Sequence, residues 1–318
     1  MNKVPKISII MTAYNASRTI GEAIESVLGQ TFKNFELLIC DDGSSDNTVK
    51  IVNSYHDSRI HLIQNKKNIG PGKSRDRLIS QARGQWITLL DADDVYTCER
   101  LEVLYEIAKK NPNFLIFDEL MECHDTENGL VPHKPIRPLP VDSHSLADTK
   151  LSFYEWITWN RTTIQLFVHN DLIKNNNIKH GDGLFGEDLE FVLNIIGKNK
   201  VPLLYVPKAM YLYRISSGSL TARPDRFDQL RGVYERSKSL FVDDPLAING
   251  LNDKIQKVHK AQVYQVFFSY FMHGKLLKAF WQALQHPWIF YAFIKRSISR
   301  IPYHLKRLRY RAKRRETV

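Results

Sequence analysis

The stretch Gly84-Gln-Trp-Ile-Thr-Leu-Leu-Asp-Ala-Asp-Asp94 decides how the first part of this sequence folds. Trp86–Leu90 is a continuous apolar run, which is typical of a strand buried on both faces of a parallel sheet. Three carboxylates, Asp91, Asp93 and Asp94, follow where that strand should end. Because open parallel sheets bind ligands at the carboxyl ends of their strands, the stretch predicts a central strand with a binding site beside it.

Around this stretch, short apolar runs alternate with segments whose apolar residues recur at helical spacing. Ser17 is expected to cap the first of these helices. Strands are expected at 7–14, 35–40, 60–63, 86–90 and 114–117, and helices at 20–28, 49–55, 73–83 and 98–110. Alternation of strand and helix over about 118 residues predicts an α/β fold, in which helices flank a mostly parallel central sheet.

The later part of the chain is less regular. Residues 123–150 are rich in His, Pro and polar groups, and we expect a long loop there. Further helices are expected at 151–160, 165–175, 188–197, 226–240, 253–273, 275–285 and 288–300, and strands at 201–206 and 209–213. Because the alternation stops after Pro224, we place a domain boundary near residue 223. It separates the α/β domain, 1–223, from a helical C-terminal region, 224–318.

The composition is that of an ordinary globular protein, with 318 residues, 43% hydrophobic and 25% charged. Cys40, Cys98 and Cys123 are too few and too scattered for a disulfide framework or a Cys-x-x-Cys zinc site. The N-terminus shows no signal-peptide pattern, and no apolar run reaches the roughly 18–20 residues that span a bilayer. These features favour a cytoplasmic protein.

The net charge of +11 is concentrated at the C-terminus. Residues 289–318 hold ten of the 45 Lys and Arg and one of the 34 acidic residues; the remaining 35 and 33 leave residues 1–288 at +2. Aromatic and aliphatic residues are interleaved with this basic run, a pattern that suits an anionic membrane surface. Nucleic acid or a solvated, disordered end are the other interpretations. We favour the membrane and expect no nucleic acid.

Polar clusters follow three of the predicted strands, at Thr12–Asn15, Asp41–Asp46 and Asp91–Asp94. Clustered carboxylates repel one another unless a cation neutralises them, and oxygen ligands favour Mg²⁺ or Mn²⁺. Such an ion normally completes its shell with substrate phosphates and water. The alternative for Asp91–Asp94 is a solvated acidic turn. Convergence of three clusters on one sheet edge favours the ligand site.

The other clusters are ambiguous when each is taken alone. Asp41–Asp46 is equally typical of a turn with a helix cap and of a site where a carboxylate accepts the N–H of a pyrimidine ring. In the second case Thr12 and Tyr14 would close over the base, although an isolated tyrosine more often packs at the edge of a core. Glu187-Asp188 is also typical of an ordinary helix start, where the helix dipole favours acidic residues.

Five segments together resemble family 2 glycosyltransferases, which are inverting enzymes with the GT-A fold. The segments are Ile7–Asn15, Ser26–Phe32, Asp41–Asp46, Asn68–Gly70 and Gly84–Asp94. The resemblance is close over residues 6–120 and looser over 180–221. It implies a GT-A domain with a Rossmann-like sheet, and a divalent metal, Mn²⁺ or Mg²⁺, as cofactor.

The resemblance also implies roles for individual residues. Asp188 is the expected catalytic base, and Asp93 the metal ligand that bridges to the diphosphate. The donor-binding residues it implies are Thr12, Tyr14 and Asp42 at the uridine, Asp91 and Ala92 of the Asp-x-Asp motif, Lys73 or Arg75 at the phosphates, and Arg214 in a segment that closes over the diphosphate. The family commonly has Arg-Asn where this chain has Arg75-Asp76. This difference bears on the assignment of Arg75 to the phosphates.

The implied activity is transfer of one sugar from a nucleotide-diphosphate sugar, and a UDP-sugar is the expected donor. The acceptor is a hydroxyl of a glycan or lipid-linked molecule in lipopolysaccharide or capsule synthesis. A Gln-x-x-Arg-Trp motif and apolar spans are absent, which argues against polymer synthesis. A nucleotidyltransferase would need a glycine-rich basic loop that 7–17 lacks, and a non-catalytic binding protein would leave the three clusters unexplained. The expected location is the inner face of the cytoplasmic membrane, by peripheral association.

Overall fold

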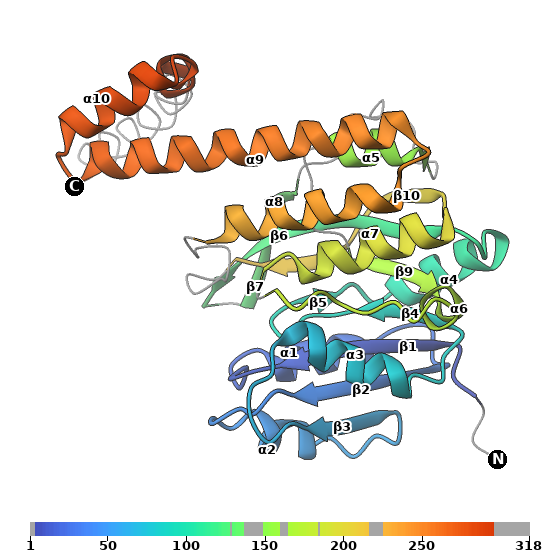
Figure 1. The fold of residues 1–318 in the computed structure, drawn as a ribbon. Helices are drawn as coiled ribbons and strands as arrows, with labels where there is room; N and C mark the ends of the chain where they lie inside the picture. The colour runs from blue at the N-terminus through green and yellow to red at the C-terminus, as the bar shows by residue number, and fades with distance from the viewer. Residues whose placement is uncertain are drawn as a thin grey trace, which may run out of the picture. The chain divides into compact units, whose positions relative to one another are not determined.

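The computed structural model describes residues 4–127, 129–136, 149–159, 165–183, 185–215 and 225–295 (Figure 1). The chain divides into two compact units, Met1–Ile255 and Gln256–Val318. The boundary expected near residue 223 lies outside the described residues. The basic tail is also outside them, apart from Lys295.

Ten strands form one sheet in the first unit. They are β1 (Ile7–Ala13), β2 (Phe35–Asp41), β3 (Ile60–Gln64), β4 (Trp86–Leu89), β5 (Val95–Tyr96), β6 (Leu115–Thr126), β7 (Gly129–Pro135), β8 (Thr149–Leu151), β9 (Leu166–His169) and β10 (Leu203–Arg214). The order is β3-β2-β1-β4-β9-β6-β10-β5, with β7 paired to β6 and β8 to β10. The pairs β1–β2, β1–β4, β2–β3 and β6–β10 are parallel. The carboxyl ends of β1, β2 and β4 therefore meet at one edge.

Ten α-helices accompany the strands in the described ranges. They are α1 (Ile20–Leu28), α2 (Thr48–Asn53), α3 (Pro71–Gln81), α4 (Arg100–Lys110), α5 (Phe153–Thr158), α6 (Asn170–Lys174), α7 (Glu187–Asn199), α8 (Arg226–Ser237), α9 (Pro245–Met272) and α10 (Leu276–Gln285). Residues 288–295 are helical as well. None of these helices combines the length with the apolar character that a membrane crossing requires. The expected α/β class is confirmed, although the sheet is mixed.

The main core lies between one face of the sheet and helices α1, α2 and α4. Ile9 of β1 and Leu37 of β2 share one buried cluster with Ile24 of α1 and Leu104 of α4. Each fully buried side chain of this size contributes about 1.5–3 kcal/mol. Helix α3 also contacts β1 and β2 and buries Leu78. This packing makes the strand ends a rigid edge on which a site can be built.

Three expectations about local structure are wrong. Residues 123–150 do not form one long loop, because β6 runs to Thr126 and pairs with β7 as an antiparallel hairpin. The expected helix at 165–175 begins instead as β9, which pairs antiparallel with both β4 and β6. Ser17 does not cap α1, whose N-cap is Thr19. A short apolar run such as Leu166–Val168 fits strand and helix equally well until its neighbours are known.

A buried ion pair lies under the Asp91–Asp94 loop. Arg100 and Asp118 are both fully buried, with Nε–Oδ2 and Nη2–Oδ1 distances of 2.9 and 2.8 Å. The guanidinium lies over the ring of Tyr96, 4.2 Å from its centroid, and 5.5 Å from that of Tyr211. Tyr211 in turn donates its hydroxyl to Asp94 at 2.7 Å. The pair therefore supports the tyrosine that holds this loop in place.

We predict that Arg100→Met destabilises the protein by about 3–5 kcal/mol, because it leaves the Asp118 carboxylate buried and without its cation. Urea unfolding followed by tryptophan fluorescence measures the change. The double variant Arg100→Met/Asp118→Leu should recover much of the loss, and Lys109→Met, from an exposed pair with Glu106, should change stability by less than about 0.5 kcal/mol. A loss below about 1 kcal/mol in Arg100→Met would contradict this account.

Candidate active site

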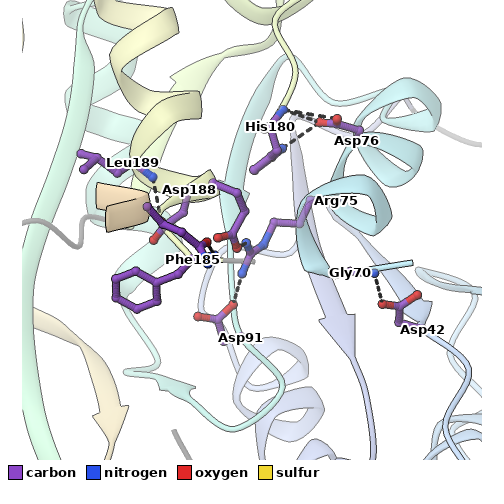
Figure 2. Close-up of polar contacts among 11 residues, drawn as sticks. Asp42, Gly70, Arg75, Asp76, Asp91, His180, Phe185, Asp188 and Leu189 are labelled. Atoms are coloured by element: carbon purple, nitrogen blue, oxygen red, sulfur yellow. Dashed lines mark hydrogen bonds and ion pairs between the residues drawn. The ribbon is translucent and has the colours of Figure 1, made fainter. Parts of the chain in front are cut away.

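Two acidic segments from distant parts of the chain meet at the sheet edge. One follows β4 and includes Asp91; the other, Glu187-Asp188, opens α7. Arg75 of α3 joins them, with Nη2 2.8 Å from Asp91 Oδ1 and Nη1 3.1 Å from Glu187 Oε1. Figure 2 shows this side chain reaching from α3 to Asp91, with Asp188 near the same guanidinium. Segments about a hundred residues apart thus form one site around a single cation.

The Arg75 guanidinium is almost completely buried. Burial by itself would lower the pKa of Arg75, but the nearby carboxylates of Asp91, Glu187 and Asp188 raise it above the ordinary value. The side chain therefore stays charged. The Arg75 guanidinium already forms two ion pairs within the protein. A bound phosphate would therefore have to share this guanidinium with Asp91 and Glu187.

The Asp93 carboxylate forms no ion pair with another described residue, although the charge of the nearby Arg214 acts to lower its pKa. No other described residue donates a hydrogen bond to it, and burial together with the charge of Asp91 raises its pKa to about 6. Its backbone oxygen accepts a hydrogen bond of 2.6 Å from Arg214 Nε. A carboxylate held in place without a cation of its own, beside a second carboxylate, fits a divalent ion with oxygen ligands.

Asp94 is a structural residue. It is buried and accepts hydrogen bonds from the Tyr211 hydroxyl at 2.7 Å and from the Arg214 backbone N–H at 2.8 Å. Burial and the charges of Asp91 and Asp93 raise the pKa of Asp94 well above its usual range. The Asp91 N–H also donates to the Tyr211 oxygen at 3.2 Å. Asp94 and Tyr211 thus tie the acidic loop to β10, while the buried Ala92 packs in the core.

The residues expected at the nucleoside lie on the adjacent ends of β1 and β2. Thr12 is half-buried and Tyr14 is 53% exposed. Asp42 is buried and holds the loop before α3: its Oδ1 accepts from Asn65 Nδ2 at 2.8 Å and from the Ile69 N–H at 2.9 Å, and its Oδ2 from the Gly70 N–H at 2.9 Å. A carboxylate has about four acceptor positions, so one remains for a ligand.

Asp41 adds an acceptor that sequence reasoning did not single out. Its Oδ2 accepts from the Ser44 N–H at 3.2 Å, but its Oδ1 is buried without a hydrogen-bond partner among the described residues. An unpaired buried acceptor is costly, so a ligand that donated to it would gain affinity. Asp41 stands directly before Asp42 in the sequence, so it was a visible candidate. The residue types alone could not show which of the two carboxylates keeps an oxygen without a partner.

Hydrogen bonds join the two loops that follow β1 and β2. Asn15, in the left-handed region at φ 51°, receives the Ser45 N–H at 2.9 Å and donates its own N–H to Ser44 Oγ at 2.9 Å. Asp46 accepts from the Ser17 N–H at 3.0 Å and the Thr48 N–H at 3.0 Å. The loop that carries Tyr14 is therefore fixed to the loop that carries Asp42.

The two remaining cations expected at the phosphates differ in environment. Lys73 is 59% exposed and lies 3.3 Å from the exposed Asp182 carboxylate. Arg214 has a side chain only 5% exposed, and besides the Asp93 backbone it pairs with Asp125 and Glu22. Lys73 is free to move toward a ligand, whereas Arg214 is already held by three acceptors.

Glu187 and Asp188 are adjacent but differ in what binds them. Glu187 is buried and paired with Arg75; burial and the charge of Asp188 raise its pKa. Asp188 is less buried, and among the described residues its carboxylate accepts one hydrogen bond, from the Leu189 N–H to Oδ1 at 2.7 Å. Of the two carboxylates, Asp188 is the one left available to a substrate.

A buried histidine that sequence reasoning missed holds the segment before this pair. The His180 backbone N–H and Nδ1 lie 3.0 and 2.7 Å from Asp76 Oδ1 (Figure 2). The imidazole ring stacks on Phe191, with centroids 3.9 Å apart. Burial lowers the pKa of His180, so at neutral pH the ring is uncharged and donates from Nδ1. Asp76 thus anchors the segment that leads to Asp188.

Comparisons with known proteins indicate the family of the chain. The model of glycosyl transferase family 2 matches residues 8–170. The E. coli β-1,3-glucosyltransferase WfgD, which by its name acts on UDP-Glc and α-D-GlcNAc-diphosphoundecaprenol, is 30% identical over 241 residues, 76% of this chain and 88% of its own. EpsE of Bacillus subtilis is 41% identical over 129 residues, 37% of this chain and 46% of its own.

A solved structure shares the fold. TarS 1–349 of S. aureus, crystallised with UDP-GlcNAc, superposes with a TM-score of 0.64 at 20% identity, covering 80% of this chain and 73% of that one. At this identity the similarity concerns the fold alone. With the family model matching half of the chain, and a relative at 30% identity over three quarters of it, the chain belongs to glycosyl transferase family 2 and is a glycosyltransferase.

Proposed function

We propose that the protein transfers a single sugar from a UDP-sugar to a hydroxyl of a glycan or lipid-linked acceptor, with inversion at the anomeric carbon. The observation that carries the proposal is the meeting of Asp91, Glu187 and Asp188 around Arg75 at the edge where β1, β2 and β4 end. Ligands of open α/β sheets bind at the carboxyl ends of the strands. The proposed reaction needs charged groups near the diphosphate and a base near the acceptor hydroxyl at that edge.

The donor's nucleoside is proposed to bind at the ends of β1 and β2. Tyr14 presents an exposed ring for stacking, and Thr12 offers a hydroxyl beside it. The open acceptor position of Asp42 and the unpaired Oδ1 of Asp41 suit the N–H of a uracil ring and a ribose hydroxyl. Asp91, one strand away, is the proposed contact for the ribose or the sugar.

The diphosphate is proposed to lie between the Asp91–Asp94 loop and Lys73. Asp93 would hold a Mn²⁺ or Mg²⁺ ion, which fits a carboxylate that lies beside Asp91 and accepts no hydrogen bond from another described residue. When bound, such an ion supplies positive charge to the departing diphosphate. Lys73 can turn from Asp182 toward the phosphates, and Arg214 contributes by fixing the Asp93 backbone.

Asp188 is proposed as the general base. Its carboxylate takes the proton from the acceptor hydroxyl while that oxygen attacks the anomeric carbon and the bond to the diphosphate breaks. A single displacement with one base leaves no covalent intermediate, so the configuration inverts. Arg75 assists by pairing with Glu187, which holds the start of α7, and therefore Asp188, at the edge of the sheet.

The acceptor is proposed to be part of a lipid-linked surface glycan, in line with the diphosphoundecaprenol acceptor that WfgD's name records. Such an acceptor requires approach to a membrane. In the second unit, α10 buries Ala279 and Ala283 but exposes Leu277, Phe280, Trp281 and Leu284 at 86%, 57%, 64% and 51%. The basic sequence after Lys295 supplies the complementary charge for an anionic surface on the cytoplasmic side.

We predict that Asp93→Asn lowers Mn²⁺-dependent hydrolysis of a UDP-sugar by about a hundredfold or more, because the leaving diphosphate loses the group that positions its counter-charge. UDP release measures hydrolysis, and calorimetry with Mn²⁺ and UDP measures metal-dependent binding. Glu106→Gln, an exposed carboxylate of α4, is the control. Undiminished, metal-dependent turnover in Asp93→Asn would remove Asp93 from the site.

For Asp188→Asn we predict unchanged binding of UDP and Mn²⁺ with a loss of turnover of about 10²–10⁴-fold, since only proton removal is affected. The matched control is Glu190→Gln, in the same first turn of α7, where the carboxylate pairs with Arg236. Normal turnover in Asp188→Asn, or equal losses in both variants, would show that Asp188 is not the base.

Membrane attachment is predicted to depend on both the tail and the exposed face of α10. Because Ile289 is buried against α9 and α10, truncation after Lys295 removes nine basic residues without opening this core. Truncation, or Trp281→Glu, should release the protein from vesicles that contain phosphatidylglycerol, with each basic residue contributing about 1 kcal/mol. Val242→Glu, an exposed apolar residue elsewhere, should not. Full binding by both altered proteins would exclude this surface.

A further inference from the structure

Three side chains capable of binding a metal meet on the β6–β7 hairpin, apart from the donor site. Glu122 and His124 come from β6 and His133 from β7, and one ligand atom of each lies within 4.8 Å of the others. Glu122 Oε1 is 3.4 Å from His124 Nε2, and the two imidazole rings are 5.0 Å apart. No step of the proposed transfer uses them.

The backbone explains why these three residues share a face. Glu122 and His124 are two residues apart on one strand, so their side chains point the same way. Across the hairpin, Glu122 pairs with Lys134 and Cys123 pairs with Pro132, which leaves His133 as an extra, unpaired residue in β7. Such a bulge redirects a side chain. It brings His133 to the face of Glu122 and His124.

The trio differs in chemistry from the Asp91–Asp93 site. Two imidazole nitrogens and one carboxylate oxygen are a typical ligand set for Zn²⁺ and related borderline ions, whereas Mg²⁺ prefers oxygen alone. In a tetrahedral Zn²⁺ site the ligand atoms lie about 3.3 Å apart. The Glu122–His124 distance of 3.4 Å already meets this, and His133 is exposed and able to adjust its rotamer.

The trio also points away from the donor site. Cys123, between the two β6 ligands, is buried on the opposite face and pairs in register with Arg214, the residue that contacts Asp93. A competing cation, Lys134 Nζ, lies 3.7 Å from Glu122 Oε2, but it is 60% exposed and easily displaced. A metal here would therefore occupy a site separate from the one proposed at Asp93.

We propose that Glu122, His124 and His133 form a second metal site, which takes Zn²⁺ or a similar nitrogen-preferring ion and leaves one coordination position open. The ion would cross-link β6 to β7. It would thereby fix the end of β6, where Asp125 holds Arg214.

The test uses the full-length protein with Zn²⁺ and, as a spectroscopic probe, Co²⁺. Wild-type protein should bind one Zn²⁺ in calorimetry, show visible Co²⁺ absorption that Zn²⁺ abolishes, and gain thermal stability with Zn²⁺. His124→Asn and His133→Asn should each weaken Zn²⁺ binding at least tenfold and lose the Co²⁺ bands. His56→Asn, an exposed histidine elsewhere, should change neither.

Asp93→Asn separates the two sites, because it should abolish metal-dependent turnover and keep the Zn²⁺ site intact. If a histidine variant fails to fold, as judged by circular dichroism, Glu122→Gln serves in its place, with the same expected loss. Absence of Zn²⁺ binding to the wild type, or binding that His124→Asn, His133→Asn and Glu122→Gln leave unchanged, would overturn the proposal and identify the trio as an ordinary ion-pair cluster.

Discussion

The two ion pairs of Arg75 hold the site together. One buried guanidinium contacts Asp91, which follows β4, and Glu187, which opens α7, so the halves of the site depend on a shared charge. Without it, the carboxylates of both segments would repel one another across the sheet edge. The neutralisation is incomplete, since one cation faces several carboxylates. The remaining negative charge is the basis on which we propose a divalent ion at Asp93 and a general base at Asp188.

The scaffold beneath the site is built to resist this repulsion. Asp94 is bonded to Tyr211, whose ring lies near the buried Arg100, and Arg100 is neutralised by Asp118. The charges that position the loop are thus paired or hydrogen-bonded, as buried charges must be. The charges that face the edge are left partly unpaired. The paired residues, such as Asp94 and Arg100, therefore support the loop, and the partly unpaired residues are those proposed to contact the donor.

Much of the fold was predictable from local pattern. Apolar runs such as Trp86–Leu90 identified the parallel strands, and polar residues after them identified the edge that carries the site. Contacts across long sequence separations were not predictable in this way. Strand β9, the β6–β7 hairpin and the pairing of Arg75 with Glu187 depend on which segments become neighbours. The family membership expected from the ordered motifs is confirmed, while the roles of Asp93 and Asp188 remain predictions.

A crystal structure with Mn²⁺ and UDP tests the central claim most directly, because anomalous scattering locates the ion independently of any activity. The account predicts one anomalous peak at the Asp93 carboxylate, with the diphosphate on the ion and the uracil ring against Tyr14. It also predicts that Asp188 stays uncoordinated and faces the open side of the site. A nucleotide bound away from the ends of β1, β2 and β4, or a metal bridged by Asp188, would contradict it.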